Sequence, residues 1–329
     1  MRDWRWYAER LGPLVALLLL IGGTALVELA TVPEGSRAFF TARNFANIIG
    51  QWSFVGIVAL GMTFVIILGG IDLSVGSMVA LAAGAAVYGM NEAAERWGDG
   101  VGIAVAVAIC LLAGPLMGLV NGLVIARGRV APFVATLGTL AIYRSLIVAP
   151  AQGGEIRSMV PRFDRIGGAS IDVATDVAIR VPALVFVGMA IAAQGVLAWT
   201  TFGRRVYAIG DNAQAARYAG VPIARVTASV YTIAGLCCGV AALLNASRLN
   251  SVSSTNLGLL YELDAIAAVV IGGTRLQGGA GRIMGTVVGV LILGVVGNML
   301  NMLGVSNFYH GLVKGLIIIA AVLVQPRKA

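Results

Sequence analysis

A few charged residues lie inside or at the ends of long apolar runs, and these are the first candidates for chemistry: Asp72, Arg144, Glu262, Asp264 and Lys314. Burying a charge in apolar surroundings costs free energy, so such a group usually faces a cavity or a partner. Asp72, in the sequence GGIDLSVGS, could contact a solute. It could equally accept hydrogen bonds from the N–H groups of Ser74 or Val75 at the start of a helix. Both roles stay open.

The other four charges also have structural explanations. Glu262 and Asp264 begin a short apolar run, where a helix N-terminus favours negative charge, and one of them could pair with Arg248. Arg144 and Lys314 carry long apolar stems, which can extend the charged group to the nearest polar boundary.

Uncharged polar side chains within the apolar runs form a second set of candidates. They could line a path for a hydroxylated solute, because amides and hydroxyls both donate and accept hydrogen bonds, or each could bond to a neighbouring helix. The candidates for the path are Asn47, Gln51, Thr136, Asn245, Asn298 and Asn301.

Motifs of common enzymes are absent from the sequence. It contains no phosphate loop G-x-x-x-x-G-K-[ST], no H-E-x-x-H and no G-x-S-x-G. The three cysteines lack metal-ligand spacing, and the single histidine, His310, has no partner for a metal cluster nearby in the sequence. We therefore expect no catalytic residue, no metal site and no ATP site in this chain.

The composition is that of a membrane protein. Of 329 residues, 59% are hydrophobic and 12% are charged, whereas a soluble protein carries about a quarter charged residues. The apolar runs approach the length that crosses a bilayer, and 44 glycines allow close helix packing. The net charge of +8 fits arginines retained in the cytoplasm better than nucleic-acid binding.

Hydropathy predicts an all-α, polytopic helical membrane protein with a single transmembrane domain over residues 1–329. Residues 1–10 form a cytoplasmic interfacial tail, and both termini are cytoplasmic, because arginines favour that side. Residues 151–180, which include several acids, form a periplasmic loop. About ten spans are expected, over residues 11–32, 47–68, 73–90, 101–125, 132–150, 181–201, 226–247, 262–273, 283–303 and 311–325.

Two spans are predicted to be short or broken, near residues 69–77 and 272–282. The sequences GGIDLSVGS and GGTRLQGGAGR align with Gly69 on Gly272 and Gly70 on Gly273, which indicates either an internal duplication or a chance match of glycines. Together with Asp72, these glycines are predicted to form a structural cap or a gate.

One short helix is predicted within the basic loop 203–225. Asp211 or Asn212 would cap it, Gly220 would end it in the left-handed conformation, and Pro222 would prevent its continuation. Ala215, Ala216 and Ala219 would give it a face of small residues for docking against another protein. An ordinary basic cytoplasmic loop is the alternative.

Four motifs in order resemble the permease subunits of ribose-type ABC sugar importers. They are GGIDLSVGS, NGLVIARGRVAPFVATLGTLAIYRS, FGRRVYAIGDNAQAARYAGV and ELDAIAAVVIGGTRLQGGAG, and the resemblance runs from about Asn44 to Val324. Neither the first forty residues nor loop 151–180 contributes to it.

This resemblance implies a permease of the bacterial inner membrane that moves a sugar or similar polyhydroxylated solute. It implies two cytoplasmic subunits that bind ATP and Mg²⁺, a second permease copy or close paralogue, and a periplasmic solute-binding protein. Residues 203–225 would hold the coupling helix, with Gly210, Asp211, Asn212, Ala215, Ala216 and Gly220 in the contact with the ATPase. The alternatives are an ion-coupled secondary transporter, or a permease for a nucleoside or furanone signal.

Overall fold

The computed structural model describes residues 4–34, 37–174 and 176–324, and helices dominate them. The long helices are α1 (Trp4–Thr31), α2 (Ala42–Ile67), α3 (Val75–Trp97), α4 (Asp99–Ala126), α5 (Pro132–Val148), α7 (Val181–Trp199), α10 (Ile223–Leu249), α12 (Ile283–Met302) and α13 (Asn307–Val324). Shorter helices are α6 (Asp164–Gly167), α8 (Thr201–Asp211), α9 (Ala213–Tyr218) and α11 (Tyr261–Ile271).

A helix lies at each of the predicted spans. Six of them, within α1, α2, α4, α7, α10 and α12, are long and apolar enough to cross a membrane, and α5 is a shorter apolar helix. The chain is therefore a polytopic helical membrane protein. The predicted tail 1–10 is mostly helical, because α1 begins at Trp4, and residues 1–3 lie outside the described residues.

The core is built around α2 and α10, which are buried along most of their length. Helix α10 packs against α4, α2 and α3, and α2 also packs against α12, α7 and α11. Glycines let α4 and α10 approach backbone to backbone: a Cβ atom at Gly114 would overlap the carbonyl oxygen of Gly235, and one at Gly118 would overlap that of Tyr231. Close approach of this kind gains dispersion contacts in a bilayer, where apolar burial alone gives little.

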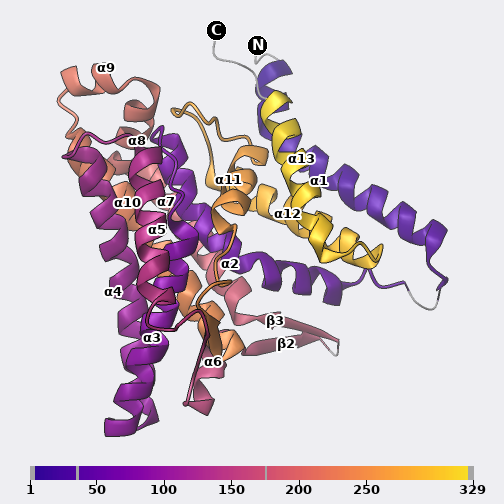
Figure 1. Cartoon of the computed structure of the whole chain (residues 1–329). Helices are drawn as coiled ribbons and strands as arrows, with labels where there is room; N and C mark the ends of the chain where they lie inside the picture. Colours follow the sequence, from indigo (N-terminus) through magenta and orange to yellow (C-terminus); the bar gives the residue numbers. More distant parts are fainter. Residues whose placement is uncertain (1–3, 35–36, 175, 325–329) are drawn as a thin grey trace.

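Helices α1 and α13 lie at one side of the bundle beside α12 (Figure 1). The apolar side chains of α1 are mostly exposed, as expected for a helix that faces lipid. The start of α1 and the end of α13 lie at the same end of the molecule as α9 (Figure 1).

The expectation of an all-α fold is wrong in one respect, since four short strands are present. β1 (Glu155–Arg157) pairs antiparallel with β4 (Ser251–Ser253), and β2 (Ser170–Ala174) pairs antiparallel with β3 (Val177–Arg180). The β2–β3 hairpin and α6 lie at the end of the molecule opposite α9 (Figure 1). The pairing gives the polar backbone of these non-helical segments hydrogen-bond partners.

Candidate coupling site and transport path

The basic segment after α7 forms two helices rather than the single short helix predicted. Thr200 ends α7 and caps α8, because its hydroxyl accepts a hydrogen bond from the Gly203 N–H at 3.1 Å. Asn212 caps α9, accepting from the Ala215 N–H at 3.0 Å, whereas Asp211 is the last residue of α8. Gly220 has φ of +75°, so the predicted left-handed end of α9 is confirmed.

The predicted face of small alanines on α9 is not available as a whole for docking. Ala216 is 5% exposed and belongs to the main hydrophobic core, because it points inward from the short helix. Ala215 and Ala219 are exposed, and Tyr218 is 89% exposed. The outward face of α9 therefore includes Tyr218, a residue that the predicted docking face did not contain.

The two glycine loops and the end of α8 meet at one place, which we call the loop junction (residues 67–70, 207–211 and 277–281). The Gly279 N–H donates to the Ile67 carbonyl oxygen at 2.9 Å, so the second loop caps the end of α2. At Gly210, a Cβ atom would overlap the same Ile67 oxygen, so only glycine fits there. The loop junction thus joins α8 to both broken spans.

A side chain strengthens the loop junction. The Tyr207 hydroxyl in α8 donates to the carbonyl oxygen of Gly281 at 2.8 Å. Burial raises the pKa of this hydroxyl above its ordinary value, so Tyr207 stays protonated and able to donate at neutral pH.

The two broken spans end in the same backbone motif. Gly69 and Gly273 have φ of +90° and +86°, and the next N–H in each case, from Gly70 and Thr274, bonds back to Val65 and Val269. This is the Schellman arrangement. The equivalent glycines are therefore Gly69 and Gly273, one residue away from the predicted alignment of Gly69 with Gly272.

Gly70 and Gly272, the other two glycines of the predicted caps, lie where the chain packs closely against a neighbouring helix. A Cβ atom at Gly70 would lie 2.6 Å from the Tyr231 hydroxyl oxygen, and one at Gly272 would overlap the carbonyl oxygen of Gly285. Both sites require close contact with a neighbouring helix.

Asp72 is fully buried and holds the start of α3. Its Oδ1 accepts hydrogen bonds from the Ser74 N–H at 2.9 Å and the Ser74 hydroxyl at 2.6 Å, as the capping hypothesis predicts. The Asn121 amide donates to Asp72 Oδ2 at 3.4 Å and to the Ser74 hydroxyl oxygen at 2.8 Å. These contacts tie the loop to α4, so the carboxylate has a structural role.

The predicted path residues do not form one cluster. Thr136 is buried and its hydroxyl accepts from the Leu73 N–H at 3.1 Å, which ties α5 to the first glycine loop. Asn245 donates to the Tyr261 hydroxyl at 3.0 Å. Asn298 exchanges hydrogen bonds with Asn44 at 2.9 and 3.1 Å.

Three of the path candidates have side chains that are at least partly exposed. Gln51 and Asn301 are exposed, and Asn47 is half-buried. On α2, Arg43, Asn47 and Gln51 follow one another at intervals of four residues, so they lie on one face of the helix. This polar face runs inward from the end of α2 that lies near the β2–β3 hairpin.

A charged pair joins α13 to α11. Lys314 Nζ lies 2.9 Å from Asp264 Oδ2, and it also lies 5.1 Å from the centre of the Trp52 ring on α2. Lys314 therefore does not extend to a polar boundary, and Asp264 does not pair with Arg248. Both expectations are wrong, because Lys314 and Asp264 pair with each other inside the bundle.

Arg144 also bonds inside the protein. Its guanidinium donates to the carbonyl oxygens of Ser254 and Leu257 at 3.1 and 2.9 Å. It holds the loop between β4 and α11 against α5.

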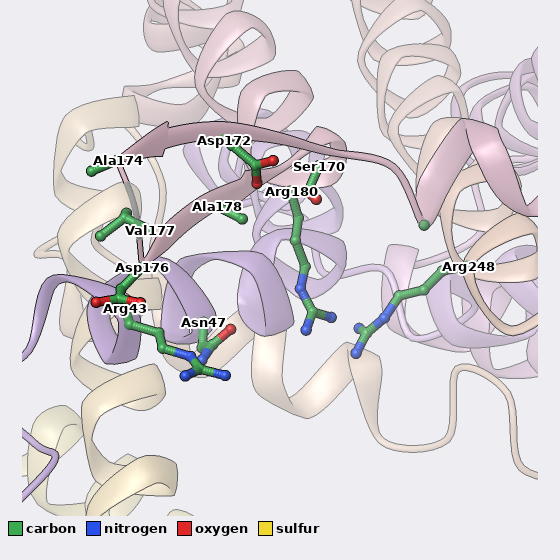
Figure 2. A pocket seen from close by; sticks show the side chains of 11 residues that line it. Arg43, Asn47, Ser170, Asp172, Ala174, Asp176, Val177, Ala178, Arg180 and Arg248 are labelled. Atoms are coloured by element: carbon green, nitrogen blue, oxygen red, sulfur yellow. The ribbon is translucent and has the colours of Figure 1, made fainter.

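A pocket of about 620 Å³ lies under the β2–β3 hairpin (Figure 2). We call it the outer pocket; it is lined by Arg43, Asn47, Gly168, Ser170, Asp172, Ala174, Asp176, Val177, Ala178, Arg180 and Arg248. Sequence reasoning missed this site. The spacing of Arg43, Asn47 and Gln51 in the sequence could have indicated a polar face on this helix. Arg180 and Arg248 lie far away in the sequence, and only the fold brings them to the same pocket.

The apolar helices form a polytopic membrane bundle, and two of them are broken at a junction that they share with α8, an arrangement that suits a membrane permease. The comparisons agree. Residues 44–322 match the family model described as "Branched-chain amino acid transport system / permease component". The chain belongs to this family of permease components.

Curated relatives cover nearly the whole chain. The ribose import permease protein RbsC of Bacillus subtilis (strain 168) is 40% identical over 98% of this chain and 94% of its own length. RbsC of Escherichia coli (strain K12) is 40% identical over 98% and 95%. The galactose/methyl galactoside import permease protein MglC of Haemophilus influenzae is 35% identical over 92% of each chain. No solved structure gives a significant match. The resemblance inferred from the four motifs is confirmed.

Proposed function

We propose that this chain is the membrane-spanning permease of an ATP-binding-cassette importer that moves a sugar or a similar small polyhydroxylated solute across the bacterial inner membrane. The observation that carries this proposal is the loop junction, where an exposed helix pair is fastened to both broken spans. The similarity to ribose and galactose import permeases over nearly the full chain supports it.

In this proposal the chain crosses the membrane ten times, through α1, α2, α3, α4, α5, α7, α10, α11, α12 and α13. The end that carries α9 is cytoplasmic and the end that carries the β2–β3 hairpin is periplasmic. The start of α1 and the end of α13 lie at the same end of the molecule as α9 (Figure 1), which supports an even number of crossings.

Coupling would pass through the loop junction. Two cytoplasmic subunits would bind ATP and Mg²⁺, and their closure would push on α9 and α8. Since Gly210 and Tyr207 contact the backbones around Ile67 and Gly281, movement of α8 would shift the end of α2 together with the loop that leads from α11 to α12. The remaining partners would be a second permease copy or close paralogue, a periplasmic solute-binding protein, membrane lipid and the solute, with no nucleic acid.

Reconstitution tests this proposal. The permease and its ATP-binding subunits are placed in liposomes together with the solute-binding protein, and uptake of labelled ribose, galactose, a nucleoside and a furanone is measured. We expect ATP-dependent uptake of at least one solute that an ionophore does not abolish. Uptake driven by an ion gradient without ATP would instead identify a secondary transporter.

A further inference from the structure

Three arginines line the outer pocket from different elements. Arg43 comes from the first turn of α2, Arg180 from the end of β3, and Arg248 from the last turn of α10. Figure 2 shows the guanidinium groups of Arg180 and Arg248 near each other and directed into the same part of the pocket, with Arg43 and Asn47 across from them.

The guanidinium groups of Arg180 and Arg248 are held in place by packing rather than by acids. The Arg248 Cζ lies 5.3 Å from the centre of the Phe54 ring. Arg180 lies along α2 at Gly50, where a Cβ atom would be 3.1 Å from its Cδ. Within the described part of the chain, neither has a carboxylate within ion-pair distance.

Two like charges in one partly enclosed pocket repel each other, and their interaction here is unfavourable. A carboxylate between them would remove the repulsion and accept charge-assisted hydrogen bonds from both guanidinium forks. Asp172 and Asp176 line the same pocket from the hairpin, and among the residues that the structure describes neither of them pairs with these arginines.

The pocket also offers groups for hydroxyls. Asn47 lies in its wall, and the polar face of α2 continues from there to Gln51, one turn further along the helix. A ligand with a carboxylate at one end and several hydroxyls along its chain would match this arrangement.

We propose that the outer pocket binds the imported solute at its entry to the permease, and that the solute is a sugar acid. Its carboxylate lies between Arg180 and Arg248, and its hydroxyls face Asn47 and Arg43. This inference rests on the proposed transport function and names the substrate class for it.

The test compares two probes with the same carbon skeleton, D-ribonate and D-ribose. Their binding to the purified permease, in complex with its ATP-binding subunits in lipid nanodiscs, is measured by equilibrium dialysis at fixed ionic strength. We expect ribonate to bind at least about tenfold more tightly than ribose, because only ribonate makes the charged hydrogen bonds. Arg180→Gln and Arg248→Gln should each remove that preference, whereas Arg165→Gln, an exposed arginine of the same loop outside the pocket, should keep it.

A second measurement needs no variant. Phenylglyoxal modification of the wild-type complex is followed by mass spectrometry, and ribonate should protect Arg180 and Arg248 but not Arg165. Equal binding of ribose and ribonate, or equal modification with and without ribonate, would overturn the inference. The inference would also be overturned if the Arg180→Gln and Arg248→Gln variants kept the preference for ribonate and lost only their affinity for the solute-binding protein. Recovery of the ATP-binding subunits in the same preparations tests the transport function separately.

Discussion

At the residue scale, Gly210 lies where three backbones meet. It comes from α8, the Ile67 carbonyl from α2, and Gly279 from the loop between α11 and α12. Glycine is needed at this position because the backbones of α8 and α2 approach closely. An unusual φ is not the reason, because the backbone of Gly210 is helical. A side chain at this position has to push the α8 backbone away from the loop junction.

We predict that Gly210→Ala lowers the stimulation of ATP hydrolysis in the assembled complex by about tenfold or more, because the methyl group separates α8 from α2. Steady-state hydrolysis with and without solute-binding protein measures this. Gly188→Ala in α7 is the matched control, since no atom lies near its added Cβ. Unchanged stimulation in Gly210→Ala would mean that α8 and α2 move independently.

Asp72 allows a stability prediction. Asp72→Ala leaves the Ser74 N–H and the Ser74 hydroxyl without their acceptor in a buried site, at a cost of about 1–3 kcal/mol. We expect a lower midpoint of thermal unfolding in detergent, whereas Asp99→Ala, at an exposed helix start, should change it little. An unchanged midpoint for Asp72→Ala would contradict the capping role and reopen a contact with solute.

At the element scale, α9 presents only part of its surface. With six residues it is too short to be stable alone, so its cap at Asn212 and its buried Ala216 hold it in place. The exposed Tyr218 then offers a large amphipathic side chain to a partner, the type often found at the centre of interfaces.

We predict that Tyr218→Ala weakens association with the ATP-binding subunit by at least about tenfold, without changing the folding of the permease. Affinity measured with the separately purified subunit checks this. Tyr309→Ala is the control, because Tyr309 is also exposed but lies at the start of α13, away from α9. Equal affinity for the two variants would place the contact elsewhere.

The pair of Lys314 and Asp264 links α13 to α11. Lys314→Met should destabilise the protein by several kcal/mol because it leaves a buried carboxylate unpaired. The double variant Lys314→Met with Asp264→Asn should recover part of the loss, and unfolding of all four forms measures the coupling. Additive losses would show that the two residues act independently.

The helices could be predicted from sequence where the signal is local. Asn212, Gly220 and Pro222 identified α9, and hydropathy located the helices of the bundle. The separate helix α8 was missed, although Thr200 is a good cap and Val206 and Ile209 form its buried side. The expectation that Ala216 lies on an exposed face of α9 was wrong, because a sequence of six residues does not show which face of the helix is buried.

Long-range features could not be predicted. β1 pairs with β4 across nearly a hundred residues, and neither strand has a clear local pattern. The loop junction and the outer pocket likewise combine segments far apart in the chain, so only the fold brings Arg43, Arg180 and Arg248 together. The sequence supplied the residue types at these sites but not their neighbours.

At the scale of the whole molecule, the two ends carry different structures. One end holds α8, α9 and the start of α1, and the other holds the β2–β3 hairpin and the outer pocket (Figure 1). Arginines after α4 and in α8 and α9 favour the first end as the cytoplasmic one.

We predict that a reporter enzyme fused after Gly210 is active in the cytoplasm and that one inserted in residues 151–180 is active in the periplasm. Paired reporters that work only on opposite sides of the membrane measure this directly. The reverse pattern would place the outer pocket in the cytoplasm and would contradict the proposed direction of entry.

A separate ATPase that drives this permease should remain bound to it during gentle purification. The most direct measurement is affinity purification of the chain in mild detergent from its own cells, followed by mass spectrometry and quantification of the proteins that accompany it. We expect an ATP-binding subunit at about one copy per permease. A preparation without any such subunit, which still transports in liposomes on an ion gradient alone, would contradict it.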